Sequence, residues 1–273
     1  MKWVARGYSA VTRSLTRVVF GESPPLARVG LVGMPRGFFP WWLVAVGVGR
    51  AFFHLFARWE RVGMENLPRE GGYILAANHV ASADPPMLAA AMYPKWPKFM
   101  AKLELFQKRP LIGWLFALSG GFPVRRFGAD LAALREAQAQ LNSGEILVMF
   151  PEGHRSADAS LMEAHPGTAL IALRSGVPVV PVGIMGSERF RRGLGVFVQR
   201  PRVRMVFGEA FVVEPLGDRV RRTDVDEASL RIMREIAALI PVEYRGVYRE
   251  RFSDLPDEAS VDRTGVTSGR GCA

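Results

Sequence analysis

The sequence predicts an α/β fold in which a mostly parallel central sheet is flanked by helices. Continuous apolar runs have the length of buried strands, and they occupy residues 73–77, 146–150 and 177–184. Helix-forming segments lie between and after them, at residues 84–92, 111–119, 130–141, 167–175 and 228–239. Apolar strands that alternate with helices are typical of a parallel sheet covered on both faces.

Local signals support individual elements. Asp84 stands before Pro85, and an N-cap residue followed by a first-turn proline predicts a helix start. Gly176 predicts the end of the 167–175 helix. Residues 200–207 alternate arginines with apolar side chains, which predicts a strand with one face in water.

Composition narrows the classes of function. The chain has 273 residues, and 49% of them are hydrophobic, which is enough for one large domain with appended segments. A formal net charge of +10 predicts an anionic partner, either a membrane, a phosphorylated substrate or nucleic acid. Nucleic acid is not expected, because the sequence has no recognised nucleic-acid motif. One cysteine, Cys272, excludes an internal disulfide, and four scattered histidines predict no metal centre.

The first 62 residues hold most of the positive charge, with nine Lys or Arg against two Glu. Ordinary solvated arginines are one interpretation, and attraction to an anionic membrane face is the other. Within this region residues 38–57 are the most hydrophobic segment, but they include Arg50 and His54. On a helix these two side chains share a stripe with Arg58 and Arg61. The pattern predicts a helix lying in one membrane leaflet. A single transmembrane span and a buried soluble helix are the alternatives.

Three regions are therefore predicted. Residues 1–62 form a basic N-terminal segment with a membrane-associated helix and no cleavable signal peptide. Residues 63–250 form the α/β domain. Residues 251–273 are rich in Asp, Ser, Gly and Thr, which predicts a disordered tail.

His79 and Asp84 are the first candidate functional pair. They lie in the loop between the 73–77 strand and the following helix, at a strand end where α/β folds bind ligands. Histidine moves protons near neutral pH, and a carboxylate fixes its tautomer. On one continuous helix, two side chains five residues apart would point in different directions. A turn between His79 and Asp84 allows the two side chains to meet. The alternative is that Asp84 only caps the helix, although a carboxylate has two oxygens and both roles are compatible.

Two further segments suit an anionic ligand. Residues 150–156, Phe-Pro-Glu-Gly-His-Arg-Ser, follow an apolar strand and provide Glu152, a permissive Gly153 and the guanidinium of Arg155. Residues 120–126 end in Arg125 and Arg126 after a glycine pair. An ordinary polar turn and an exposed strand edge are the respective structural alternatives. Residues 177–182, Val-Pro-Val-Val-Pro-Val, indicate by themselves a core strand.

Together, in this order, the four segments resemble the glycerolipid acyltransferase family, which includes bacterial 1-acyl-sn-glycerol-3-phosphate acyltransferases. Its NHxxxxD, Gly-x-x-Pro/Phe-Val-x-Arg, FPEGxRS and VPVVPV boxes match residues 78–84, 120–126, 150–156 and 177–182. A stretch from Met100 to Leu105 also looks like the family's. The resemblance covers about residues 63–210.

The resemblance implies a direct transfer of an acyl group from acyl-CoA or acyl-carrier protein to 1-acyl-sn-glycerol 3-phosphate, giving phosphatidate. His79 is implied as general base and Asp84 as its orienting partner, with no acyl-enzyme, no metal and no other cofactor. The implied substrate-binding residues are Asn78, Lys102, Arg125, Arg126, Glu152, Gly153 and Arg155. The implied location is the cytoplasmic face of the cell membrane, in contact with membrane lipids.

Three positions depart from the family's usual pattern. His154 stands where Thr is commoner, Arg125 where Asp or Asn is frequent, and Pro166 where a Lys often precedes Gly167. Arg125 is a candidate to replace the charge of that Lys. These departures leave the acceptor open: glycerol 3-phosphate, another lysophospholipid or a non-glycerol lipid are alternatives. A non-catalytic lipid-binding protein on the same fold is the alternative from a different class.

Overall fold

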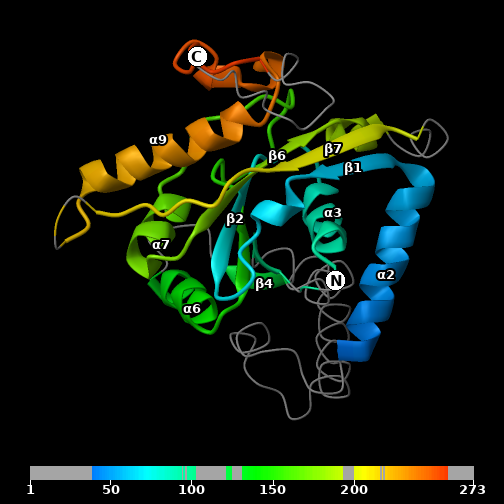
Figure 1. Cartoon of the computed structure of the whole chain (residues 1–273), viewed down its shortest axis with the longest axis horizontal. Coiled ribbons are helices and arrows are strands. Elements are labelled where there is room, and N and C mark those ends of the chain that lie inside the picture. Colours follow the sequence, from blue (N-terminus) through cyan, green and yellow to red (C-terminus); the bar gives the residue numbers. More distant parts are fainter. Residues whose placement is uncertain are drawn as a thin grey trace, which may run out of the picture. The chain divides into compact units, whose positions relative to one another are not determined.

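The computed structural model describes residues 39–93, 95, 97–102, 121–124, 131–192, 200–215, 217 and 219–257 (Figure 1). Seven strands in these ranges are hydrogen-bonded in the order β1-β7-β6-β2-β5-β3-β4. Strand β2 spans Tyr73–Ala77 and is buried throughout. The chain divides into two compact units. The predicted α/β class, with a central sheet and flanking helices, is confirmed.

The first unit contains helix α2 (Phe39–Phe56), strands β3 (Lys98–Lys102), β4 (Gly121–Val124) and β5 (Ile146–Met149), helix α6 (Leu131–Asn142) and most of helix α3 (Asp84–Ala91). Strand β3 pairs in parallel with both β4 and β5. Helix α6 turns Leu134, Ala137 and Leu141 into the core beside β5. The parallel pairing agrees with the apolar, unalternating character of these strands.

The second unit contains strands β1 (Arg58–Val62), β6 (Val179–Met185) and β7 (Arg202–Phe207), and helices α7 (Gly167–Ser175) and α9 (Arg222–Ala238). Short 3-10 helices are η2 (Met64–Asn66), η3 (Ser187–Arg192), η4 (Val242–Tyr244) and η5 (Gly246–Tyr248). Strand β6 is buried along its whole length, and helix α9 packs against both β6 and α7 (Figure 1). Four of its buried side chains are Ile232, Met233, Ile236 and Ala237.

Strand β7 is the exception to parallel pairing. It runs parallel to β1 but antiparallel to β6, with Ile184 opposite Met205. Its exposure alternates as predicted: Arg202 is exposed, whereas Val203 and Met205 are buried. The β1–β7, β3–β4 and β3–β5 pairs are thus parallel, and the β6–β7 pair is antiparallel.

The N-terminal helix is shorter than the charge stripe implied. Helix α2 ends at Phe56, and Arg58 begins strand β1, so Arg58 and Arg61 do not continue the helical stripe of Arg50 and His54. The parallel pairing of β1 with β7 supplies the backbone hydrogen bonds that a longer helix would have made. Among the described residues no helix combines the length and the apolar character needed to cross a membrane.

The C-terminal boundaries also differ from expectation. Helix α9 begins at Arg222 rather than at residue 228, because its polar first turn hides the amphipathic pattern. The predicted tail starts too early, since Phe252 is buried and stacks on Tyr248 at a centroid distance of 5.2 Å. The buried Arg245 donates a hydrogen bond of 3.1 Å to the carbonyl of Leu255. Residues 258–273 of the predicted tail lie outside the described residues, as do residues 1–38.

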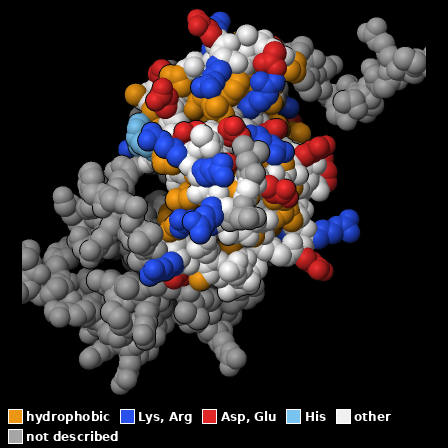
Figure 2. All heavy atoms as spheres, turned by 90° about the vertical axis from the view of Figure 1, so that its left-hand side faces the viewer, with side chains coloured by type: hydrophobic (Ala, Val, Ile, Leu, Met, Phe, Trp, Pro, Cys, Tyr) orange, Lys and Arg blue, Asp and Glu red, His pale blue; other side chains and the backbone are white. Residues whose placement is uncertain are grey.

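The surface drawn in Figure 2 mixes basic, acidic and apolar side chains. Its blue and red side chains are interspersed, and no single sign of charge dominates this face. The net charge of +10 is therefore not concentrated here.

Candidate active site

The site is built on the loop that follows β2, in the second unit. Asn78 fixes the start of this loop: its side-chain amide donates to the carbonyl of Ile184 at 2.9 Å, and its Oδ1 accepts from the Ile184 amide at 2.6 Å. Asn78 is buried, so both ends of its side chain join the end of β2 to β6. The predicted substrate contact of Asn78 stays a prediction. A buried amide that satisfies a backbone N–H and a backbone carbonyl holds the loop in one position.

Asp84 is the anchor of the loop. One oxygen, Oδ2, accepts hydrogen bonds from the amides of Val80 and Ala81 at 2.8 and 2.7 Å, and lies 2.9 Å from Nδ1 of His79. The other oxygen, Oδ1, accepts from the hydroxyl of Ser187 at 2.6 Å. The carboxylate is fully buried, so these four contacts replace water as its partners.

The carboxylate of Asp84 points back into the loop that precedes its own helix. Residues 85 and 86 are both proline, so the first two positions after Asp84 have no N–H to be capped. The bonds run instead to Val80, Ala81 and the ring of His79. Asp84 does start helix α3, but its carboxylate organises the loop and the histidine.

The imidazole of His79 is held on two sides. Its Nδ1 contacts Asp84, and its ring stacks on Phe150 with 4.1 Å between centroids and 23° between planes. A carboxylate at Nδ1 favours the proton on that nitrogen, which leaves the lone pair on Nε2. The side chain of His79 is 15% exposed, against 0% for Asp84. Asp84 is thus the buried member of the pair, and His79 is the member that solvent can reach.

Glu152 ties the loop after β5 to the His79 loop. Its Oε1 accepts from the His79 amide at 2.8 Å, and its Oε2 accepts from the Met162 amide at 3.0 Å. The amide of Ser156 adds a hydrogen bond of 2.9 Å to the His79 carbonyl. Burial raises the pKa of Glu152 to about 7, although the two amide hydrogen bonds oppose this rise. Glu152 therefore holds the His79 loop and the Met162 segment together, and its implied substrate contact stays a prediction.

The exposed part of the same loop carries the predicted anion-binding groups. Arg155 donates a hydrogen bond of 2.6 Å to the hydroxyl of Ser82, so its guanidinium is beside the His79 loop. Gly153 has a left-handed φ of 68°, and a Cβ there would lie 2.5 Å from Cδ2 of His165. The ring of His165 also makes an edge contact with His154 at a centroid distance of 6.1 Å. Two histidines thus border the loop that holds Arg155.

Three predicted substrate-binding residues cannot be added to this geometry. The side chain of Lys102 lies outside the described residues, although its backbone ends strand β3. Arg125 and Arg126 lie outside them altogether. In the described ranges no three side chains gather in a way that could hold a metal ion.

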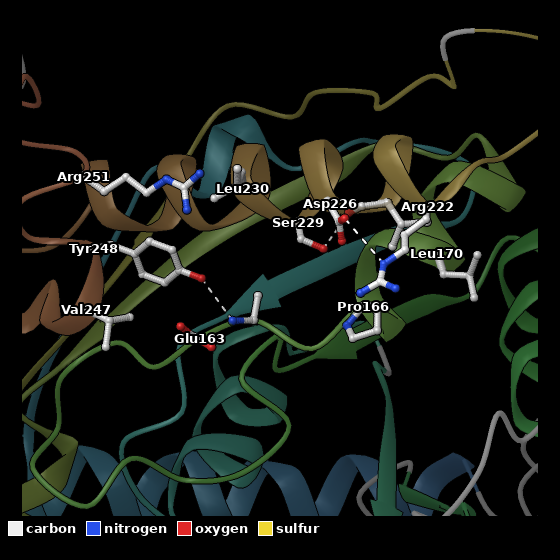
Figure 3. A pocket seen from close by; sticks show the side chains of 12 residues that line it. Glu163, Pro166, Leu170, Arg222, Asp226, Ser229, Leu230, Val247, Tyr248 and Arg251 are labelled. Carbon is white, nitrogen blue, oxygen red and sulfur yellow. Dashed lines mark hydrogen bonds and ion pairs between the residues drawn. The ribbon is translucent and has the colours of Figure 1, made fainter.

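A cavity of about 640 Å³ is lined in part by the loop that follows Met162 (Figure 3). Its wall includes Glu163 and Pro166 from this loop, with side chains from helix α9 and from η5. The hydroxyl of Tyr248 accepts a hydrogen bond of 3.0 Å from the Ala164 amide. The cavity wall is thus continuous with the segment that Glu152 holds.

Two residues of the site were not predicted. Ser187, bonded to Asp84, follows the fourth box by five residues, and Phe150, stacked on His79, is the first residue of the third box. The only sequence signal for Ser187 is that it follows a predicted strand, because residues that follow neighbouring strands can meet at one edge of the sheet. Phe150 carried no signal, because an apolar ring at a strand end is ordinarily core.

Comparisons with known proteins show what this chain is similar to. Residues 58–185 match the family model described as acyltransferase. A 1-acyl-sn-glycerol-3-phosphate acyltransferase of Streptococcus pneumoniae is 32% identical over 63% of this chain and 61% of its own length. The chloroplastic enzyme LPAT1 of Arabidopsis thaliana, with the same activity in its name, is 30% identical over 51% of this chain and 43% of its length. The matched stretch thus spans less than two thirds of these relatives.

A solved structure extends the likeness to the fold. The crystal structure of the 1-acyl-sn-glycerophosphate acyltransferase PlsC of Thermotoga maritima is 25% identical, with a TM-score of 0.51. The likeness covers 84% of this chain and 92% of that chain. The family match starts where β1 starts and ends where β6 ends, so it includes His79, Asp84 and Glu152. Residues 58–185 are therefore similar in sequence to the acyltransferase family, and the fold is similar to that of PlsC.

Proposed function

We propose that the chain transfers a fatty acyl group from acyl-CoA or acyl-carrier protein to 1-acyl-sn-glycerol 3-phosphate, giving phosphatidate. The observation that carries the proposal is the contact between Nδ1 of His79 and Oδ2 of Asp84, inside the stretch that matches the acyltransferase family model. Similar proteins named 1-acyl-sn-glycerol-3-phosphate acyltransferases support the choice of acceptor.

In this proposal Nε2 of His79 removes the proton of the acceptor's free hydroxyl. The hydroxyl oxygen attacks the thioester carbonyl, forming the new ester bond as the carbon–sulfur bond breaks. The departing thiolate takes the proton back from His79, so the histidine returns to its neutral form. Asp84 keeps the ring in the required tautomer and stabilises the transient imidazolium. No serine nucleophile takes part.

The acceptor's phosphate is proposed to bind beside the Glu152 loop. Arg155 is exposed and is positioned by Ser82, and a guanidinium forms paired hydrogen bonds with phosphate oxygens. Lys102, Arg125 and Arg126 remain predicted contacts to the same group. His154, one of the three departures from the family's usual pattern, lies in this loop and contacts the ring of His165.

We further propose that α2 lies in the cytoplasmic leaflet of the cell membrane. Its described part exposes Val48, Phe52 and Leu55, and Leu55 is 64% exposed. Apolar side chains on an exposed helix match the interfacial region of a bilayer. A membrane position is also consistent with a reaction whose acceptor and product both carry acyl chains.

The decisive experiment is an assay of the full chain in detergent with labelled palmitoyl-CoA and a panel of acceptors. The panel contains 1-acyl-sn-glycerol 3-phosphate, glycerol 3-phosphate and lysophosphatidylcholine. We expect transfer to the first acceptor and its loss in His79→Ala. His54→Ala is the matched control, since His54 lies on α2, outside the site.

The outcomes separate the competing functions. Full transfer by a folded His79→Ala protein would exclude the histidine mechanism. Preference for another acceptor would keep the mechanism and change the substrate. Absence of transfer by the wild type to every acceptor, together with tight binding of the lysolipid, would favour a lipid-binding protein.

A further inference from the structure

A second basic site lies in a groove of about 570 Å³ at one end of β1, β6 and β7. Among the residues that line this basic groove are four arginines and a single carboxylate, that of Glu60. The arginines are Arg58, Arg189, Arg202 and Arg204. A concave surface with an excess of one charge focuses the electrostatic potential and attracts ions of opposite sign.

Strand register places the basic groove at the same edge of the sheet as the candidate catalytic loop. Arg58 is opposite Arg202 on β1 and β7. A Cβ on Gly186, which directly follows β6, would lie 2.0 Å from the carbonyl oxygen of Arg202. Asn78 holds the end of β2 against Ile184, near the same end of β6. Neighbouring strands are about 4.8 Å apart, so β7 is about 10 Å from β2.

The groove and the catalytic pair also share a segment of chain. Met185 and Gly186 line the groove, and the next residue, Ser187, donates its hydroxyl hydrogen to Asp84. A ligand in the groove therefore lies close to His79 without occupying its loop. Because Arg155 is already beside His79, the groove is a separate anion site.

The chemistry of the groove suits a nucleotide. Arg204 is 3.7 Å from the carboxylate of Glu60. The exposed Arg58, Arg189 and Arg202 can bind several phosphate oxygens through paired hydrogen bonds. Two aromatic side chains, Trp59 and Tyr244, also line it and can contact a base. The cavity of Figure 3 differs, because its Arg222 and Arg251 are balanced by Glu163 and Asp226. Of these two cavities of the described residues, the groove therefore suits a ligand with several negative charges better.

We infer that the basic groove binds the phosphate-bearing nucleotide end of an acyl-CoA donor. The inference rests on the proposed function, in which the acceptor has one phosphate and CoA has three. With the acceptor's phosphate at Arg155, the groove is left for the donor, and its thioester extends toward His79. A volume of about 570 Å³ matches a small molecule, whereas a carrier protein would be recognised over a broader surface.

Direct binding tests this inference without turnover. Equilibrium dialysis of labelled CoA against the full chain in detergent compares the wild type with Arg202→Gln. Arg202 is exposed, so the substitution removes charge without creating a cavity. We expect about ten-fold weaker CoA binding, since a charge-assisted hydrogen bond contributes on the order of one decade in affinity. Arg135→Gln, an exposed position on α6, is the matched control. Equal CoA affinity in all three proteins overturns the inference.

Kinetics then identify which part of which substrate the groove holds. In Arg202→Gln we expect a raised KM for palmitoyl-CoA, with unchanged KM values for palmitoyl-pantetheine, which lacks the nucleotide, and for the acceptor. The inference is overturned if Arg202→Gln impairs transfer from palmitoyl-CoA and from palmitoyl-pantetheine equally. It is also overturned if the KM of the acceptor rises, or if only the use of palmitoyl-carrier protein is impaired. A wild type that binds CoA but transfers nothing refutes the proposed function instead.

Discussion

Ser187 donates a hydrogen bond of 2.6 Å to Oδ1 of Asp84 from a position 103 residues further along the chain. Both side chains are buried, and Oδ2 of the same carboxylate already serves His79 and two loop amides. The hydroxyl therefore completes the set of hydrogen-bond partners around the Asp84 carboxylate. It fixes the carboxylate, and through it the imidazole, with an atom supplied by the segment after β6.

Ser187→Ala is expected to lower kcat on the order of ten-fold, because Asp84 gains freedom to move and His79 loses its fixed orientation. The KM of the acceptor is expected to stay the same. Steady-state kinetics on the full chain measure this split. Ser229→Ala is the control, since its hydroxyl also donates an internal hydrogen bond, to Val225, but on α9. Equal kcat values in the two variants would show that Ser187 is only structural.

The buried Glu152 predicts a pH-dependent stability. Its pKa is raised to about 7 in the folded chain, above the ordinary value of 4.5, because burial disfavours the charged form. The group therefore stabilises the fold fully below pH 4.5, and this contribution is lost as pH rises through about 7.

Denaturant unfolding of the wild type and Glu152→Gln from pH 4.5 to 8 measures the effect. The free energy of unfolding of the wild type, relative to the variant, should fall by about 3 kcal/mol across this range. Glu145→Gln is the comparison, because the carboxylate of Glu145 is more exposed and forms an ion pair with Lys98 instead of contacting the site. A pH-independent difference between wild type and Glu152→Gln would contradict the raised pKa.

Alanine substitutions at Gly153 and Gly71 separate the cost of backbone strain from the cost of a steric clash. Both have a left-handed φ, 68° and 80°, but a Cβ meets His165 at 2.5 Å only at Gly153, while Gly71 faces open space. We expect Gly71→Ala to cost about 1 kcal/mol of unfolding free energy and Gly153→Ala clearly more. Only Gly153→Ala should also reduce transfer. Equal costs in thermal or denaturant unfolding would show that His165 moves aside freely.

Leu55→Glu tests the membrane role proposed for α2. Because a charged side chain opposes insertion of the exposed apolar face, we expect weaker co-sedimentation with phosphatidylglycerol-containing vesicles. Val247→Glu is the matched control, since Val247 on η5 is 59% exposed and Leu55 is 64% exposed. Equal losses in both variants would point to a general charge effect, and no loss in either would remove α2 as an anchor.

Much of the fold could be predicted from the sequence, where local pattern and tertiary environment agree. Strands β2 and β6 are apolar runs that are buried, and helices α6 and α7 end close to their expected residues. The prediction was wrong at β1, because Trp59 and Arg61 follow an apolar helix and their pattern would also fit a continued helix. Its strand character depends on pairing with β7, more than 140 residues away, which no local pattern contains.

The sequence by itself determined the catalytic candidates, since His79, Asp84, Glu152 and Arg155 follow strand ends in a recognisable order. It left open whether Asp84 caps a helix or orients His79. The tertiary structure decided this, because the carboxylate turns back onto the loop and contacts the ring of His79. Only the fold brought in Ser187, since long-range hydrogen bonds depend on which strand ends meet, and this is set by the packing of the whole sheet.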